Sequence, residues 1–141
     1  MKFDLEWRDR RVGSSQTPRR FLDYIVDGDS LYERHGADFI APLGWLPADE
    51  DEKAARRLLR EEPPDVDGRV ALYICPEDGD LLCGAITARI ERDGEDIIWS
   101  DLAMSSFDFV ERKWHHDPKW DELRFPASEY RKAIAERPPV G

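Results

Sequence analysis

The sequence predicts an α+β fold, in which a mostly antiparallel sheet of five or six strands carries one or two helices on a face. The main observation is that residues 69–103 hold three runs of alternating apolar and polar side chains, separated by glycine-containing turns. Residues 48–62 and 126–136 instead have the apolar spacing of helices. The length of 141 residues suits a single domain over residues 1–141.

The first strands are predicted near the N-terminus. Phe3, Leu5 and Trp7 alternate with charged residues, the pattern of a half-buried strand. Residues 20–32 then predict a hairpin, because a β-rich run is followed by the dipeptide Asp27-Gly28, which favours a tight turn.

The first helix is predicted over residues 48–62. Pro47 precedes it, and Asp49 is expected to act as its N-cap. Acidic residues fill the first turn, where they interact favourably with the helix dipole, and Pro63 ends the helix.

Residues 69–103 predict a three-stranded antiparallel meander with a defined register. A first turn centred on Gly79 places Leu72 opposite Ile86, and a second turn at Asp93-Gly94 places Ile90 opposite Ile97. A slip of one residue would move a strand's apolar side chains to the other face. Together the two registers predict one core face made of Val70, Leu72, Ile74, Ile86, Ala88, Ile90, Ile97 and Trp99.

The C-terminal part is predicted to be less regular. Residues 105–122 are expected to form a long loop with aromatic anchors, and residues 123–125 a short strand. A final helix begins at Pro126 and turns Tyr130 and Ile134 inward.

The net charge of −10 is concentrated in residues 48–110, which hold 17 acidic and 7 basic side chains. Such a field repels nucleic-acid phosphates and attracts a basic protein. We therefore expect a basic protein partner and no nucleic acid. The longest weakly charged run, residues 39–48, is broken by proline and glycine, so no membrane span is predicted. Because residues 1–11 lack the apolar segment of a secretory signal, a cytoplasmic location is expected.

Two cysteines flank the first turn of the meander. The predicted register places Cys75 opposite Cys83, on the face away from the core. Three interpretations remain open: small structural side chains, a redox pair, or part of a metal site. Zinc usually requires four ligands, and the chain has no second cysteine pair to supply them. We therefore expect no metal and no cofactor.

The motif "CPEDGDLLCGAIT" at residues 75–87 resembles that of a family of small, poorly characterised bacterial proteins, whose hairpin reads C-P-x-C-G-D-x-x-C-G followed by A-[IV]-T. The likeness extends to the "VDG" turn, the strand around Trp99 and the segment "RFPASEYRKAI". Some members are labelled oxidoreductases, so the resemblance implies redox chemistry at the cysteines. Asp78 replaces one cysteine of the motif here, which removes the thiol that such chemistry would use.

Other patterns of catalytic chemistry are weak. The one histidine cluster consists of His115, His116 and Asp117. Three interpretations of this cluster are open: solvated loop residues, metal ligands, or groups in acid–base chemistry. The sequence contains neither a P-loop nor a dinucleotide-binding glycine motif, and Ser105-Ser106 lacks the context of a nucleophile elbow. We assign no catalytic residues and favour a protein that is not an enzyme.

The function expected from these observations is a non-enzymatic, acidic protein-binding module. Its sharpest form is an immunity- or antitoxin-like inhibitor of a basic partner. The alternatives are a redox or metal-binding protein that uses Cys75 and Cys83, and a mimic of DNA. The residues expected to contact the partner are Glu77, Asp78, Asp80, Glu95, Asp96, Trp114 and Trp120.

Overall fold

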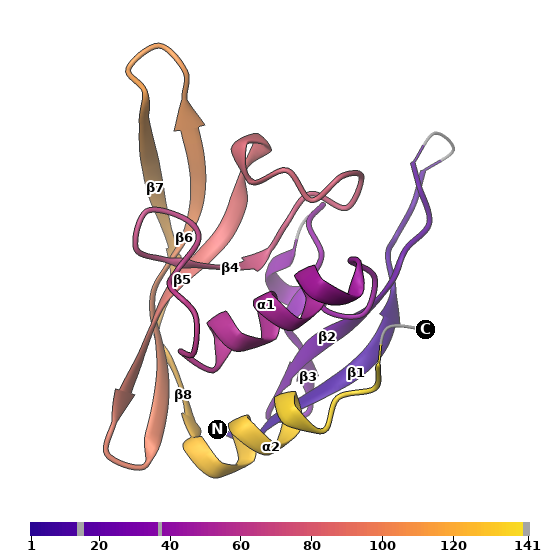
Figure 1. The fold of residues 1–141 in the computed structure, drawn as a ribbon, viewed down its shortest axis with the longest axis vertical. Coiled ribbons are helices and arrows are strands. Elements are labelled where there is room, and N and C mark those ends of the chain that lie inside the picture. Colours follow the sequence, from indigo (N-terminus) through magenta and orange to yellow (C-terminus); the bar gives the residue numbers. More distant parts are fainter. Residues whose placement is uncertain (14–15, 37, 140–141) are drawn as a thin grey trace.

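A computed structural model describes residues 1–13, 16–36 and 38–139 (Figure 1). The α+β prediction is confirmed, since two antiparallel sheets of three and five strands pack with two α-helices in the described part of the chain. None of the helices among these residues has the length and apolarity that crossing a membrane requires.

The smaller sheet has the order β1-β2-β3, with β1 at Phe3–Asp9, β2 at Arg20–Val26 and β3 at Asp29–Ser30. The predicted turn is confirmed: Asp27 and Gly28 both have positive φ, 52° and 85°, as a type I′ turn requires. The returning strand is shorter than predicted. After Ser30 the chain enters η1 (Tyr32–Gly36), a π-helix, because the Ser30 hydroxyl accepts the backbone N–H of Glu33.

Helix α1 spans Ala48–Leu58 and buries the predicted apolar stripe, but its ends differ from the prediction. Asp49 is not the N-cap: Pro47 occupies that position and no side chain caps the helix. The helix ends before Pro63 because Arg60 adopts a left-handed conformation with φ 63°. The N–H of Glu61 then donates to the carbonyl of Arg56 at 2.7 Å, which closes the last turn.

The larger sheet contains the predicted meander. Its order is β4 (Val70–Tyr73), β5 (Ala85–Asp93), β6 (Asp96–Asp108) and β7 (Lys113–Trp120), and β8 (Leu123–Pro126) also pairs with β6. Val70 lies opposite Ala88 as predicted, but a bulge then places Tyr73, not Leu72, opposite Ile86. Leu72 and Ile86 nevertheless belong to the same buried cluster.

The predicted register of the second turn is wrong by two residues. Asp93 pairs with Asp96, so Gly94 and Glu95 form the turn and Ile90 lies opposite Trp99. Gly94 takes φ 60°, the positive value that the first position of such a turn favours. A shift of two residues keeps every side chain on its face, so the predicted core face survives. The exception is Ile74, which packs in a separate, smaller cluster after the bulge in β4.

The prediction of a long loop over residues 105–122 is wrong, since β6 continues to Asp108 and β7 returns beside it. Helix α2 (Ala127–Ala135) follows β8 as predicted, with Pro126 at the N-cap position and Tyr130 and Ile134 buried.

One buried cluster joins both sheets and both α-helices. Trp99 of β6 has its ring within 6.1 Å, centroid to centroid, of aromatic rings from the smaller sheet, β8 and α2. Those rings belong to Phe3, Tyr24, Phe125 and Tyr130. Such aromatic contacts add stability beyond the apolar area they bury, and this cluster fixes the larger sheet against the smaller one.

Candidate protein-binding surface

The end of the β6–β7 hairpin projects from the body of the protein. Strand β5 begins at Ala85, which lies opposite Ser105, so the part of β6 beyond Ser105 pairs with β7 alone. We name residues 106–115 the β6–β7 ribbon. It forms the upper end of the molecule in Figure 1.

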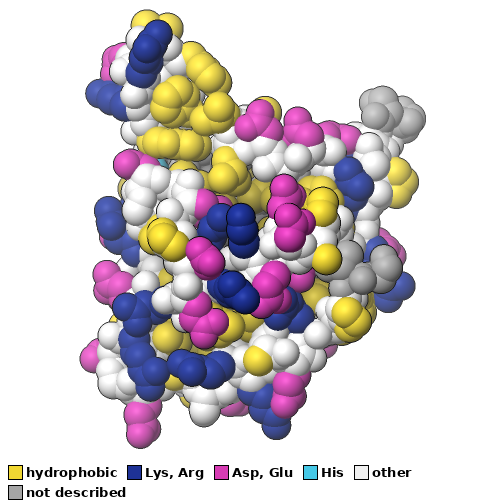
Figure 2. Space-filling view, viewed as in Figure 1, with side chains coloured by type: hydrophobic (Ala, Val, Ile, Leu, Met, Phe, Trp, Pro, Cys, Tyr) yellow, Lys and Arg dark blue, Asp and Glu magenta, His cyan; other side chains and the backbone are white. Residues whose placement is uncertain are grey.

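Aromatic side chains gather on one face of the β6–β7 ribbon. Phe107 lies opposite Trp114, with ring centroids 5.4 Å apart, and the ring of Phe109 is 5.1 Å from that of Phe107. At the tip, Phe109 is 67% exposed and Val110 92% exposed. Figure 2 shows hydrophobic side chains concentrated on this projection. Exposed apolar groups gathered in this way are typical of interaction sites.

The turn of the ribbon is held by Asp108. Its Oδ1 accepts the backbone N–H groups of Val110 and Glu111 at 2.8 and 3.0 Å, and these bonds lower the pKa of the carboxyl. The other oxygen, Oδ2, lies 3.3 Å from Nε2 of His115. Ligand-type atoms of Asp108, Glu111 and His115 lie within 4.8 Å of one another, so one half-buried and two exposed donors of metal-binding type meet here. The hydrogen bonds of Asp108 give this cluster a structural explanation.

The apolar surface continues from the ribbon onto the body. Trp114 and Leu81 both pack against the smaller buried cluster that contains Ile74 and Ala85. Leu81 belongs to η2 (Leu81–Cys83), a short 3₁₀ turn in which the neighbouring Leu82 is 43% exposed. Trp114 and η2 therefore form a bridge between the ribbon and the centre of this face.

Beside this bridge lies a cleft of about 300 Å³ between α1 and β4, which we name the α1–β4 cleft. Its apolar lining consists of Pro42, Leu46, Ala54, Val70, Ala71, Ile74 and Leu81. Its charged lining consists of Glu50, Lys53, Arg57, Asp65 and Asp78. An apolar floor with a few charged groups at the edge is the usual construction of a binding pocket.

The acidic residues predicted from the first turn have different surroundings. Asp78 and Asp80 are exposed, and each accepts one local backbone N–H, from Asp80 and from Leu82. Glu77 is instead held by the N-terminal part of the chain. Its carboxylate accepts hydrogen bonds from the Thr17 hydroxyl at 2.6 Å and from Arg10 at 2.7 Å. These bonds lower the pKa of Glu77 to about 2.

The second predicted acidic turn lies elsewhere. Glu95 and Asp96 follow the far end of β5, whose nine residues separate the two turns by about 30 Å at roughly 3.3 Å per residue. Asp96 also forms an ion pair with Arg124 at 3.1 Å. The structure thus brings Asp78, Asp80 and Trp114 together on one surface and leaves Glu95 and Asp96 apart from them.

Trp120 lies on another part of the molecule. Its ring stacks on His35 of η1, with centroids 4.1 Å apart and planes inclined by 9°. It is half-buried and packs against the main core. Trp120 therefore covers the contact between η1 and the end of its own strand, β7.

Both cysteines are free thiols. The predicted pairing of Cys75 with Cys83 across the hairpin is wrong: β4 ends at Tyr73 and Cys83 closes η2, so neither cysteine lies in a paired strand. Desolvation by neighbouring atoms, followed by the nearby charge of Asp80, raises the pKa of the Cys83 thiol, although this residue is exposed. A thiol activated for redox chemistry has a lowered pKa, so these surroundings do not favour thiolate chemistry at Cys83.

A chain of hydrogen bonds that the sequence did not predict crosses the larger sheet. The Ser105 hydroxyl lies 2.6 Å from Nδ1 of His116, whose Nε2 lies 2.8 Å from a carboxylate oxygen of Asp67. Thr87 continues the chain with a 2.8 Å contact to Ser105. These residue types form catalytic triads, but Ser105 has no exposed surface from which its oxygen can attack a substrate. The chain joins β5, β6 and β7 to the turn at residue 67.

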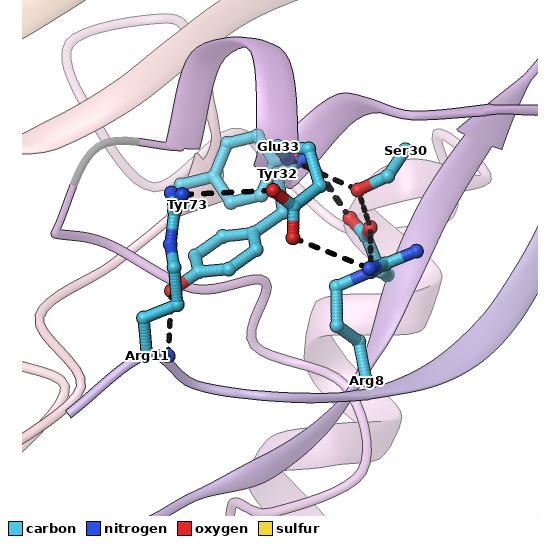
Figure 3. Close-up of polar contacts among 7 residues, drawn as sticks. Arg8, Arg11, Ser30, Tyr32, Glu33 and Tyr73 are labelled. Carbon is cyan, nitrogen blue, oxygen red and sulfur yellow. Dashed lines mark hydrogen bonds and ion pairs between the residues drawn. The ribbon is translucent and has the colours of Figure 1, made fainter.

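A second polar cluster surrounds Asp23, a fully buried carboxylate in β2. Figure 3 labels Arg8, Ser30, Tyr32 and Tyr73, which lie around this carboxylate. It accepts hydrogen bonds from Arg8 at 2.9 Å, from Ser30, and from the backbone N–H of Tyr32 at 3.3 Å. Burial raises the pKa of Asp23 above its ordinary value. The cluster attaches η1 to the smaller sheet and is a structural element.

A scan against protein-family models, a search of curated proteins and a search of solved structures each return no significant match to this chain.

Proposed function

We propose that this protein is a non-enzymatic protein-binding module that engages a basic protein through the β6–β7 ribbon and the adjacent acidic residues Asp78 and Asp80. The exposure of the ribbon tip carries the proposal. Phe109 and Val110 are left largely in water at the end of a projecting hairpin, next to the aromatic pair Phe107 and Trp114.

The ribbon suits binding because it is ordered before a partner arrives. Backbone bonds to Asp108 fix its turn, and the aromatic side chains already pack against one another. Binding then costs little conformational entropy. Aromatic side chains that become buried at the centre of an interface commonly supply most of its binding energy.

The charge of the chain indicates the kind of partner. Residues 48–110 carry the whole net charge of −10, and they include Asp78, Asp80 and all of β6. A basic surface would be attracted to this region, and salt would screen the attraction. An immunity-like inhibitor of a basic enzyme is one class of protein that would use such a surface.

The test is an affinity pull-down from host lysate at low salt, with the wild-type protein and two variants. Phe109→Ser combined with Val110→Ser removes the apolar tip. Val12→Ser is the matched control, because Val12 is another exposed valine, on the N-terminal side of the chain. We expect the wild type and the control to recover a basic protein in 1:1 ratio, and the tip variant to lose it.

The identity of the recovered protein and its salt dependence complete the test. A basic partner whose affinity falls as salt rises supports the proposal. Recovery of no stoichiometric partner, or equal recovery by the tip variant, overturns it.

A further inference from the structure

We infer that the α1–β4 cleft is a second part of the same binding surface and takes an apolar side chain from a segment of the partner that also carries lysine or arginine. This inference rests on the proposed function, and it deepens that function by naming the chemistry of the bound segment.

The cleft and the β6–β7 ribbon are connected through shared contacts. Leu81 lines the cleft and also packs, with Trp114, against the cluster around Ile74. Trp114 in turn contacts the ring of Phe107 on the ribbon. Figure 2 shows hydrophobic side chains on the projection and further ones toward the middle of the same face, between charged groups. A partner seated on the ribbon therefore lies next to the cleft.

The size and lining of the cleft suit an apolar side chain. A volume of about 300 Å³ is enough for one large side chain, up to the size of tryptophan. The floor is apolar, because Ala54, Ala71 and Ile74 face it. A large side chain at position 54 would fill the space.

The edge of the cleft selects cationic neighbours of that side chain. Arg57 lies 3.6 Å from Asp65, so their charges offset one another. The remaining charged lining is Glu50, Lys53 and Asp78, and Asp80 adds a further carboxylate in the same loop as Asp78. The balance is negative at the end that leads to η2, where a lysine or arginine of the partner would pair with Asp78 or Asp80.

The experiment uses a phage-displayed library of random dodecapeptides, selected on the immobilised full-length protein. Three variants measure what the selected peptides require. Ala54→Leu fills the cleft, Asp78→Lys reverses the charge at its edge, and Asp49→Lys is the matched control, since Asp49 is exposed on the same helix but does not line the cleft. Thermal melts confirm that each variant is folded.

We expect enrichment of peptides that place a large apolar residue within a few positions of lysine or arginine. Ala54→Leu and Asp78→Lys should each weaken binding of a synthesised representative about tenfold, and Asp49→Lys less than twofold. If Ala54→Leu misfolds, Ala54→Val, which adds fewer atoms to the cleft, takes its place. Absence of enrichment, enrichment of acidic peptides, or binding that is indifferent to the cleft variants overturns the inference.

The same variants separate this inference from the proposed function. A partner that is lost by the ribbon-tip variant and weakened by Asp78→Lys, but bound normally by Ala54→Leu, would leave the proposed function in place and overturn the cleft inference alone.

Discussion

Glu77 accepts hydrogen bonds from Thr17 and Arg10, which lie 60 and 67 positions earlier in the chain. The neighbouring Asp78 also carries a carboxylate, but the hydrogen bond it accepts comes from its own loop. The sequence predicts correctly that residues 77–80 form an acidic turn. It does not show which carboxylate is held by distant residues, because no local pattern encodes contacts with the N-terminal segment.

At the scale of single residues, Glu77 predicts a defined loss of stability in acid. Its pKa in the folded protein is about 2, against an ordinary value of 4.5. A lowered pKa means that the carboxylate stabilises the fold above pH 4.5, and that this contribution is lost as the pH falls toward 2. Glu77→Gln should therefore be less stable than the wild type at pH 7, and the difference should disappear near pH 2.

Urea unfolding at a series of pH values measures this difference. Glu95→Gln is the control, because it removes one exposed negative charge from the other acidic turn. A difference between Glu77→Gln and the wild type that stays constant from pH 7 to pH 2 would show that the ion pair and hydrogen bonds of Glu77 do not stabilise the fold.

Substitution of Asp23 should lower the stability of the fold more than substitution of Glu77. Removal of the buried carboxylate of Asp23 takes the shared hydrogen-bond acceptor away from four donors. These donors are Arg8, Ser30, the backbone N–H of Tyr32 and the hydroxyl of Tyr73. Asp23→Ala should lower the free energy of unfolding by about 3 kcal/mol. Ser30→Ala, which removes one of these donors, should lower it by about 1 kcal/mol. Equal losses in the two variants, measured by chemical unfolding, would contradict a central role for the carboxylate.

At the scale of elements, the sequence does not predict that most of residues 105–122 lie in β6 and β7. Strand β7 is at the edge of its sheet and is largely exposed. Its burial alternates over residues 113–116, but the inward positions carry Trp114 and the polar His116, so the apolar signal of a half-buried strand is weak. Pro118 also argues against a strand, although an edge strand tolerates proline. By contrast, β1 and α2 bury one side, and the apolar periodicity of these elements and of the meander predicts them.

The register between β5 and β6 is likewise not determined by apolar periodicity alone. Apolar alternation defines which face a residue occupies, but a shift of two residues leaves the face unchanged. The apolar pattern therefore fits the predicted pair of Ile90 with Ile97 as well as it fits the observed pair of Ile90 with Trp99. Only the conformation of the turn at Gly94 separates them.

The C-terminal end of α1 provides a prediction at this scale. Arg60 has φ 63° in a turn whose hydrogen bonds, from Arg60 to Arg57 and from Glu61 to Arg56, are those that usually accompany glycine. Because glycine adopts this conformation without steric cost, Arg60→Gly should stabilise the protein by about 1 kcal/mol and raise Tm by about 3 °C.

Calorimetry of the variant tests this expectation. Lys53→Gly, in the interior of the same helix, should have the opposite effect and cost about 1 kcal/mol. A lower Tm for Arg60→Gly would mean that the arginine side chain contributes more to stability than its backbone conformation costs.

At the scale of the whole molecule, the two sheets share one core, in which Trp99 contacts aromatic rings from the smaller sheet, β8 and α2. Sequence periodicity predicts that Trp99 is buried. It does not predict that the strands divide between two sheets, because that division depends on packing between distant segments.

The shared core predicts that the protein unfolds in one cooperative step. Urea transitions followed by far-UV and near-UV circular dichroism, under reducing conditions, should coincide. Trp99→Ala should shift both transitions together and lower the free energy of unfolding by about 4 kcal/mol. Two separated transitions in either protein would show that the sheets fold independently.

Strand β6 has a mechanical consequence for the molecule. It pairs with β5 on one side, and on the other side with β8 near its start and β7 toward its end, so the ribbon is a direct extension of the most extensively bonded strand. Inter-strand hydrogen bonds run perpendicular to the strands. A pull applied along the ribbon would load many of these bonds at once in shear. The ribbon is thus a stiff extension of β6, and a force applied to it would reach the body of the protein before the hydrogen bonds of the hairpin break.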